Sequence, residues 1–298
     1  MGRRLRFPTI FRGMEKWKHA PEPNFKGRLE LDEDLRELVP FIDWRFFFYA
    51  WSVGEKSEAA AALKRDAEAE LERLVAEGWT RARAVLEFVR VERHGDSLDV
   101  LAPECACGVR HPPVARLHFL RMQEAGEGEP LRSVADYFSP VEPDWLGMFA
   151  LSAGLGADER ARAFDAAGDP YRALLVRTLV VRLTEAFSEK LHRDVMKKWW
   201  GYAPDRPFGT RPVPGYPTTP DHSEILTLWR LLRPETIGMQ ITASRMMQPE
   251  ASICGYYVAH PASRYFSISH IGEDQLRDYA RRKGWPLETA RKELSRLL

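Results

Sequence analysis

The chain has 298 residues, of which 44% are hydrophobic and 29% charged. This composition is typical of a soluble globular protein and excludes an intrinsically disordered one. Its 44 Lys and Arg residues against 43 Asp and Glu leave a net charge of +1, which lacks the broad basic field of a general nucleic-acid binder. Three cysteines are too few for a disulfide framework, and the sequence has no run of about 18 apolar residues that could span a membrane. Together with the net charge, these features lead us to expect a cytoplasmic protein without nucleic-acid or membrane partners.

The first part of the chain predicts two helices and three strands. Residues 32–38 are expected to form a short charged helix. Ala, Leu, Glu, Lys and Arg dominate residues 56–77, which predicts a helix that Gly78 ends. Three strands are expected, the first two joined by a turn at residues 94–96, and they are placed at 83–92, 97–101 and 114–122.

Between these helices lies segment 41–51, which is dense in aromatic residues. Such a density is not expected to face solvent, and we predict that Trp44, Phe46 and Phe47 belong to the core. Asp43 stands inside this segment, so its carboxylate needs a partner or a ligand.

The strongest signal in the second half is one long helix. Asp169 and Pro170 are an N-cap residue and a first-turn proline, and an apolar helical period then continues to Trp200, before Gly201. This is about 45 Å of helix at about 1.5 Å per residue, which favours a spine for one domain. The proline-rich residues 203–220 predict an extended loop.

The remaining segments complete a mixed set of elements. Residues 221–224 have capping-box spacing before an apolar helix. Strands are expected at 237–243, 252–259 and 265–271, and closing helices at 274–283 and 287–298. With no repeats and no low-complexity linker, one α+β domain is favoured over two.

Common functional motifs are missing or weak. The sequence contains no GxxxxGK[ST] phosphate loop, no HExxH zinc pair and no GxSxG elbow. The two glycines in Ala153–Gly156 are interpreted as a loop that starts a helix. Cys105, Cys107 and His111 have a possible metal spacing, but a structural zinc needs four ligands, so we predict no metal site.

Several segments together resemble the activation domain of cobalamin-dependent methionine synthase. The most specific is RPVPGYPTTPDHSE at 211–224, which is similar to the family's RPxPGYPxxPxH(T/S)E. Further matching segments follow the family's order, at 42–51, 135–154, 182–203, 251–266 and 274–284. This chain departs from the family at Ile241–Ser244, where it has ITAS in place of the family's LTES and so lacks the acidic residue.

The resemblance implies a fold, a domain division and a ligand. The expected fold is a single α+β domain with a twisted, mainly antiparallel sheet flanked by helices, one of them long and central. Residues 31–298 would form a domain that binds S-adenosylmethionine (AdoMet), and residues 1–30 an N-terminal extension. AdoMet carries a carboxylate, an ammonium and a sulfonium.

The resemblance also implies roles for eight residues. An arginine fork suits the ligand carboxylate and carboxylates suit its ammonium. The carboxylate is assigned to Arg211, the ammonium to Asp43 and Glu185, the adenosine to the Val213–Gly215 loop with Tyr265 and Phe266, and the catalytic position near the cobalt face to Tyr216.

Structural alternatives exist for most of these residues. Arg211 could form a loop salt bridge, Asp43 could cap a helix or pair with Arg45, and Glu185 could pair with Arg182. The aromatic side chains at 216, 265 and 266 could be packing residues. Three histidines are expected to be hydrogen-bonded structural residues, namely His192, His222 and His260.

The expected partner carries the cobalamin. The sequence contains no DxHxxG cobalamin motif, so we expect a free-standing reactivation protein that acts in trans on a cobalamin-dependent methionine synthase, with a flavodoxin-type electron donor. Methyl transfer would occur only with that partner. Two alternatives stay open: a reactivator of another corrinoid methyltransferase, and a non-catalytic AdoMet sensor or assembly subunit.

Overall fold

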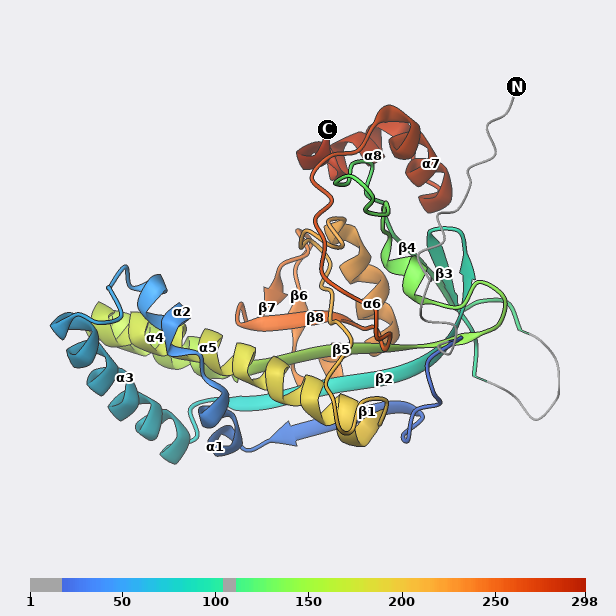
Figure 1. Cartoon of the computed structure of the whole chain (residues 1–298). Coiled ribbons are helices and arrows are strands. Elements are labelled where there is room, and N and C mark those ends of the chain that lie inside the picture. The colour runs from blue at the N-terminus through green and yellow to red at the C-terminus, as the bar shows by residue number, and fades with distance from the viewer. Residues whose placement is uncertain (1–17, 104–110) are drawn as a thin grey trace, which may run out of the picture.

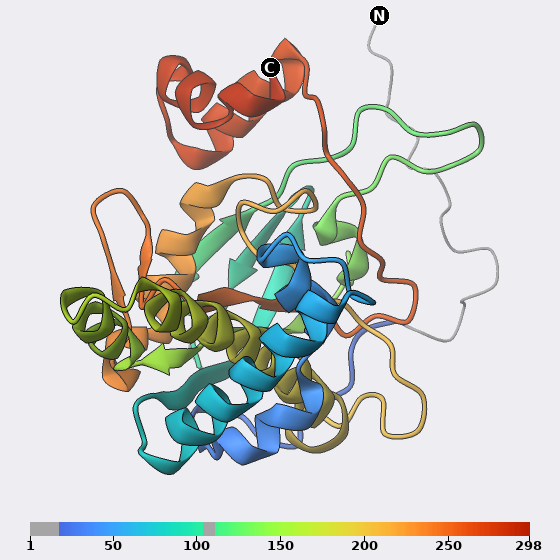
Figure 2. The same cartoon turned by 90° about the vertical axis from the view of Figure 1, so that its left-hand side faces the viewer.

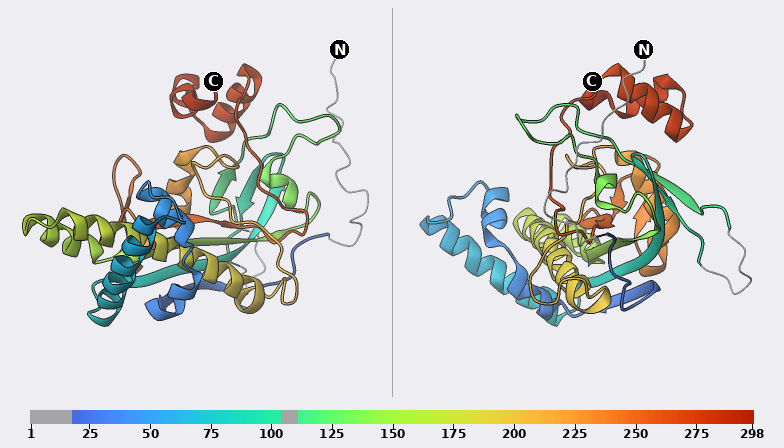
Figure 3. Two further views of the ribbon diagram at one scale, coloured as in Figure 1. Left: turned by 60° about the vertical axis from the view of Figure 1, so that its left-hand side comes forward. Right: turned by 45° about the vertical axis from the view of Figure 1, so that its right-hand side comes forward.

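A curled antiparallel sheet forms the centre of the computed structural model, which describes residues 18–103 and 111–298. The strand order is β4–β3–β2–β5–β8. β1 and β3 pair with different parts of the same edge of the long strand β2. The right-hand view of Figure 3 shows the curl of the long strand β2. The strands are β1 (Gly27–Glu33), β2 (Arg81–His94), β3 (Ser97–Val100), β4 (Ala115–His118), β5 (Asp144–Leu155) and β8 (Ser252–Tyr257).

The central strand β5 has both faces covered. All twelve of its residues are buried, and successive side chains enter two different cores. Phe149 and Leu151 pack in the core beneath the long helix, whereas Met148 and Ala150 pack in the core on the other face. β5 therefore separates the two main layers of the protein.

The long helix α5 (Pro170–Asp194) crosses one face of this sheet (Figure 1). Asp169 caps it by accepting a hydrogen bond from the Arg172 backbone N–H, and Pro170 occupies the first turn, as predicted. A π-helical turn (Val195–Trp199) continues it to Gly201, where the positive φ of 81° ends the element. The expected central helix is confirmed.

Shorter helices complete both layers. Helices α1 (Leu35–Leu38), α2 (Trp44–Ala50), α3 (Glu58–Ala76) and α4 (Ala157–Ala166) contact α5, and Figure 2 shows this layer from the left-hand side of Figure 1. α6 (Ile225–Leu232) packs on the opposite face of the sheet. The C-terminal helices α7 (Glu273–Lys283) and α8 (Leu287–Glu293) have a small core of their own. Short 3-10 turns lie at Val39–Phe41, Val134–Tyr137, His222–Glu224, Pro234–Ile237 and Ser295–Leu297. A two-stranded hairpin consists of β6 (Gln240–Ile241) and β7 (Met247–Gln248).

Three expectations are corrected by the structure. The helix predicted from residue 32 begins at Leu35, because Asp32 and Glu33 pair with β2 as part of β1. Residues 265–271 form no strand; this segment runs along the proline-rich loop instead, where the Ile268 N–H donates to the Pro217 carbonyl at 2.9 Å. Phe46 is 57% exposed, because the helical period of α2 turns Phe47 inward and Phe46 outward.

The mixed α+β fold with a curled antiparallel sheet and flanking helices is as predicted. Among the described residues, no helix combines the length and the apolar character that a membrane crossing requires.

Candidate functional site

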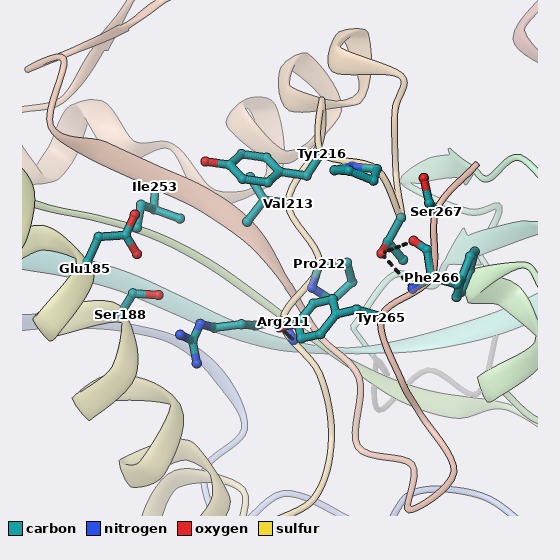
Figure 4. A pocket seen from close by; sticks show the side chains of 12 residues that line it. Glu185, Ser188, Arg211, Pro212, Val213, Tyr216, Ile253, Tyr265, Phe266 and Ser267 are labelled. Atoms are coloured by element: carbon teal, nitrogen blue, oxygen red, sulfur yellow. Dashed lines mark hydrogen bonds between the residues drawn. The ribbon is translucent and has the colours of Figure 1, made fainter. Parts of the chain in front are cut away.

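A pocket of about 500 Å³ lies between α5, the proline-rich loop and the segment after β8 (Figure 4). This volume is in the range of cavities that hold small molecules. Its lining joins residues that are far apart in the sequence: Glu185, Ser188, Arg211, Pro212, Val213, Tyr216, Pro217, Thr218, Ile253, Tyr265, Phe266 and Ser267. Six of the eight predicted site residues are in this set.

The loop that forms one wall of the pocket is tied to β8 and to itself. The Tyr256 N–H donates to the Pro212 carbonyl at 3.0 Å, and Thr210 and Val258 exchange backbone hydrogen bonds. The Thr219 hydroxyl donates to the Val213 carbonyl at 2.7 Å. Prolines restrict φ along this loop, so few other conformations compete with the observed one.

Two glycines allow this course of the chain. A Cβ at Gly255 would lie only 2.6 Å from the Pro212 carbonyl oxygen, so the close approach of loop and strand requires glycine. Gly215 has a φ of 90°, and its N–H donates to the Thr219 carbonyl at 2.8 Å. Gly215 lines a neighbouring cavity of about 700 Å³ and not the pocket itself.

Arg211 is held by groups from α5 and from the segment after β8. Its Nη1 donates to Glu189 Oε2 at 3.0 Å and to His192 Nδ1 at 3.1 Å. Its backbone N–H donates to the Tyr265 hydroxyl at 3.0 Å. The expected alternative, a salt bridge for Arg211, is therefore present, and the guanidinium still lines the pocket.

Glu185 projects from α5 into the same pocket (Figure 4). Within the described residues its carboxylate makes no hydrogen bond or ion pair, so the alternative pairing with Arg182 does not occur. Ser188 lies one turn further along α5 and lines the pocket beside it. An unpaired carboxylate thus shares one cavity with a guanidinium.

Asp43 lies outside this pocket, in an adjoining one of about 460 Å³ that Glu185 and Arg211 also line. Its carboxylate caps α2, accepting from the Arg45 backbone N–H at 3.0 Å, and pairs with Arg45 Nη2 at 2.6 Å. The hydrogen bond from Arg45 lowers the pKa of Asp43. Both structural alternatives for Asp43 are therefore observed.

The two groups that hold Arg211 have shifted pKa values. Burial, followed by the charge of Arg211, lowers the pKa of His192 to about 4. Burial opposes a lower pKa for Glu189, but the charges and hydrogen bonds of Arg211 and Arg193 outweigh it and lower the pKa. At neutral pH the site therefore contains a neutral imidazole and an ionised carboxylate.

The aromatic residues of the site differ in exposure. Tyr216 is 62% exposed and Tyr265 59% exposed, so neither is a core residue. Phe266 is half-buried and packs at the edge of two cores. The exposed rings mark the mouth of the pocket.

Sequence reasoning did not assign Glu189, Ser188 or Ile253 to the site, and it treated His192 as structural only. The available signal was spacing on α5, since residues three and four apart share a face of a helix. Of the proposed metal-spaced residues, Cys105 and Cys107 lie outside the described ranges. Residues 18–103 and 111–298 contain no group of three metal-ligating side chains.

Comparisons with known proteins give one consistent result. The family model described as vitamin B12 dependent methionine synthase, activation domain, matches residues 34–284. A solved structure titled as the MetH reactivation domain bound to AdoHcy superimposes with a TM-score of 0.88 and 34% sequence identity, covering 95% of this chain and 94% of that one. The chain belongs to the family of vitamin B12-dependent methionine synthase activation domains.

Proposed function

We propose that the pocket binds AdoMet and that this chain, with AdoMet bound, supports the reductive methylation of cobalamin on a methionine synthase. The observation that carries the proposal is that the guanidinium of Arg211 and the unpaired carboxylate of Glu185 line one cavity. AdoMet carries a carboxylate and an ammonium on one carbon, and these two side chains have the complementary charges. The AdoHcy reported for the similar structure is the demethylated form of AdoMet.

The remaining predicted residues have roles consistent with this ligand. Val213, Tyr265 and Phe266 line the pocket and would hold the adenosine. Asp43 would act on the ammonium from the adjoining pocket, which Glu185 and Arg211 connect to the first. Gly215 would act through the course of the loop, because it lines only the cavity beyond Tyr216.

Tyr216 would stand between the ligand and the partner. It is exposed and lines both the pocket and the neighbouring cavity, so a flat ring system docking at this mouth would contact it. The partner's cobalamin, reduced by one electron, would supply the nucleophile for the methyl group of the sulfonium, and AdoHcy would be the product left in this pocket. The contribution of this chain is to orient AdoMet and to exclude water, with no proton transfer required.

The cobalamin is proposed to arrive on a methionine synthase acting in trans, and the electron to come from a flavodoxin-type donor. The support is the family, whose description is the activation domain of a vitamin B12-dependent methionine synthase. A cytoplasmic location fits such partners.

Calorimetry with AdoMet tests the ligand. The wild-type protein should bind, and Arg211→Ala should weaken binding by about tenfold to a hundredfold, because a hydrogen bond to a charged group contributes about 1.5–3 kcal/mol. Arg206→Ala is the matched control, since Arg206 is exposed near the start of the same proline-rich loop and is not among the residues that line the pocket. No heat with the wild type, or equal binding by Arg211→Ala, would contradict the proposal.

A further inference from the structure

The guanidinium of Arg211 is only partly used by the protein. All of its side-chain hydrogen bonds to described residues come from Nη1, which donates to Glu189 and His192. Nε and Nη2 donate to no described residue, and together they form one of the two edges with which a guanidinium binds a carboxylate. The free edge is therefore the one suited to a bidentate ligand.

His192 is fixed on all sides. Its side chain is 7% exposed, its ring stacks on Tyr257 at a centroid distance of 5.2 Å, and its Nε2 lies 3.3 Å from the Tyr202 hydroxyl. The guanidinium of Arg211 has donors and no acceptor, so Nδ1 of His192 must be the acceptor. The imidazole proton is then on Nε2, where the Tyr202 oxygen accepts it.

Neutral His192 is also the state that its surroundings favour. Burial and the charge of Arg211 lower the pKa of His192 to about 4. A doubly protonated ring would direct an N–H at the guanidinium and would push it away. Glu189 uses Oε2 for Arg211 and Oε1 for Arg193, at 3.1 Å, so the second acceptor of Nη1 is His192.

We infer that His192 is a positioning residue for the ligand carboxylate: with Glu189 it holds Nη1 of Arg211 so that the Nε–Nη2 edge faces the pocket. This inference rests on the proposed function, because the ligand is AdoMet. It goes beyond a structural role for His192, because removing the acceptor should weaken the binding of the ligand carboxylate and leave the binding of the other ligand groups unchanged.

Two variants separate positioning from packing. His192→Asn places an amide oxygen near the position of Nδ1 and keeps an acceptor for Arg211. His192→Phe keeps a flat ring against Tyr257 and has no acceptor. His118→Phe is a control, because His118 is also buried, with its pKa lowered to about 4, and is not among the residues that line the pocket.

The readout is calorimetry with AdoMet and with decarboxylated AdoMet, which lacks only the carboxylate. We expect His192→Phe to bind AdoMet about tenfold more weakly and to bind the decarboxylated analogue as the wild type does. His192→Asn and His118→Phe should keep the wild-type preference for AdoMet. Thermal melting checks that each variant is folded.

Three outcomes would overturn the inference, and they differ from one another. If the wild type prefers AdoMet and His192→Phe keeps the full preference, His192 does not position the Arg211 guanidinium. The same holds if the variant binds both ligands more weakly by the same factor. If the wild type has no preference between the ligands, the assignment of Arg211 to the carboxylate fails as well. If it binds neither, the proposed function fails.

A second measurement needs no ligand. Nitrogen-15 NMR of the imidazole groups at pH 7, with the His192 signals assigned from their loss in His192→Asn, should show a protonated Nε2 and a bare Nδ1. A protonated Nδ1 would overturn the inference even if AdoMet binds.

Discussion

Replacing Gly255 with alanine should damage the pocket through the backbone. The added Cβ would lie 2.6 Å from the Pro212 carbonyl oxygen and 3.1 Å from Val213 Cγ2. Ordinary carbon–oxygen contacts are about 3.3 Å or longer, so the loop has to retreat by about 0.7 Å. The Tyr256 N–H to Pro212 hydrogen bond, now 3.0 Å, would lengthen beyond the usual range.

This displacement has two expected magnitudes. Overpacking costs about 1–3 kcal/mol of unfolding free energy, and the weakened hydrogen bond adds about 1 kcal/mol. Because Arg211 precedes the displaced residue directly, AdoMet affinity should fall by about tenfold or more, which corresponds to about 1.4 kcal/mol.

Urea unfolding and calorimetry measure the two effects, and Gly154→Ala supplies the control. Gly154 lies in β5, and its added Cβ would be 3.2 Å from the Ala251 Cβ and 3.3 Å from the Pro249 Cβ, away from the pocket lining. Gly154→Ala should lose stability and keep its AdoMet affinity. A folded Gly255→Ala protein with wild-type affinity would refute the reasoning that contact between β8 and the loop positions the site.

Two further predictions concern stability. The Lys283 side chain is only 8% exposed, and its Nζ lies 2.6 Å from Glu224 and 3.2 Å from Asp221. Lys283→Met should therefore cost about 3–5 kcal/mol of unfolding free energy in urea, whereas replacing the exposed Lys292 with Met should change it by less than about 0.5 kcal/mol. Equal losses in the two variants would contradict this. Burial lowers the pKa of three histidines from 6.5 to about 4, namely His118, His192 and His260. The unfolded chain therefore binds protons first, so stability should be full above pH 6.5 and fall by about 2 kcal/mol per histidine between pH 7 and pH 5. Urea midpoints that do not move between these pH values would refute it.

Local signals made part of the fold predictable. The long helix α5 follows from Asp169, Pro170 and Gly201, which act on neighbouring residues only. The central strand β5 was not predicted, because its residues are buried on both faces and show no alternation of apolar and polar side chains. Its identity depends on strands and helices that are distant in the sequence.

The site was predictable where motifs mark it. The resemblance located Arg211, Glu185 and the aromatic residues at the mouth, and the structure brings them into one pocket. The role inferred for His192 depends on the approach of the proline-rich loop to one face of α5, and helical spacing alone does not say which loop meets that face. Asp43 is expected to face a ligand and also has a local partner, because its carboxylate pairs with Arg45.

Methyl transfer in a reconstituted system tests the central claim most directly. A methionine synthase without its own activation domain, prepared with cob(II)alamin, is mixed with a flavodoxin-type reductant and methyl-labelled AdoMet, with and without this chain. We predict that label reaches the cobalamin only when the chain is present, and that Arg211→Ala abolishes most of the transfer. Transfer that is independent of the chain, or AdoMet binding without any transfer, would contradict the account.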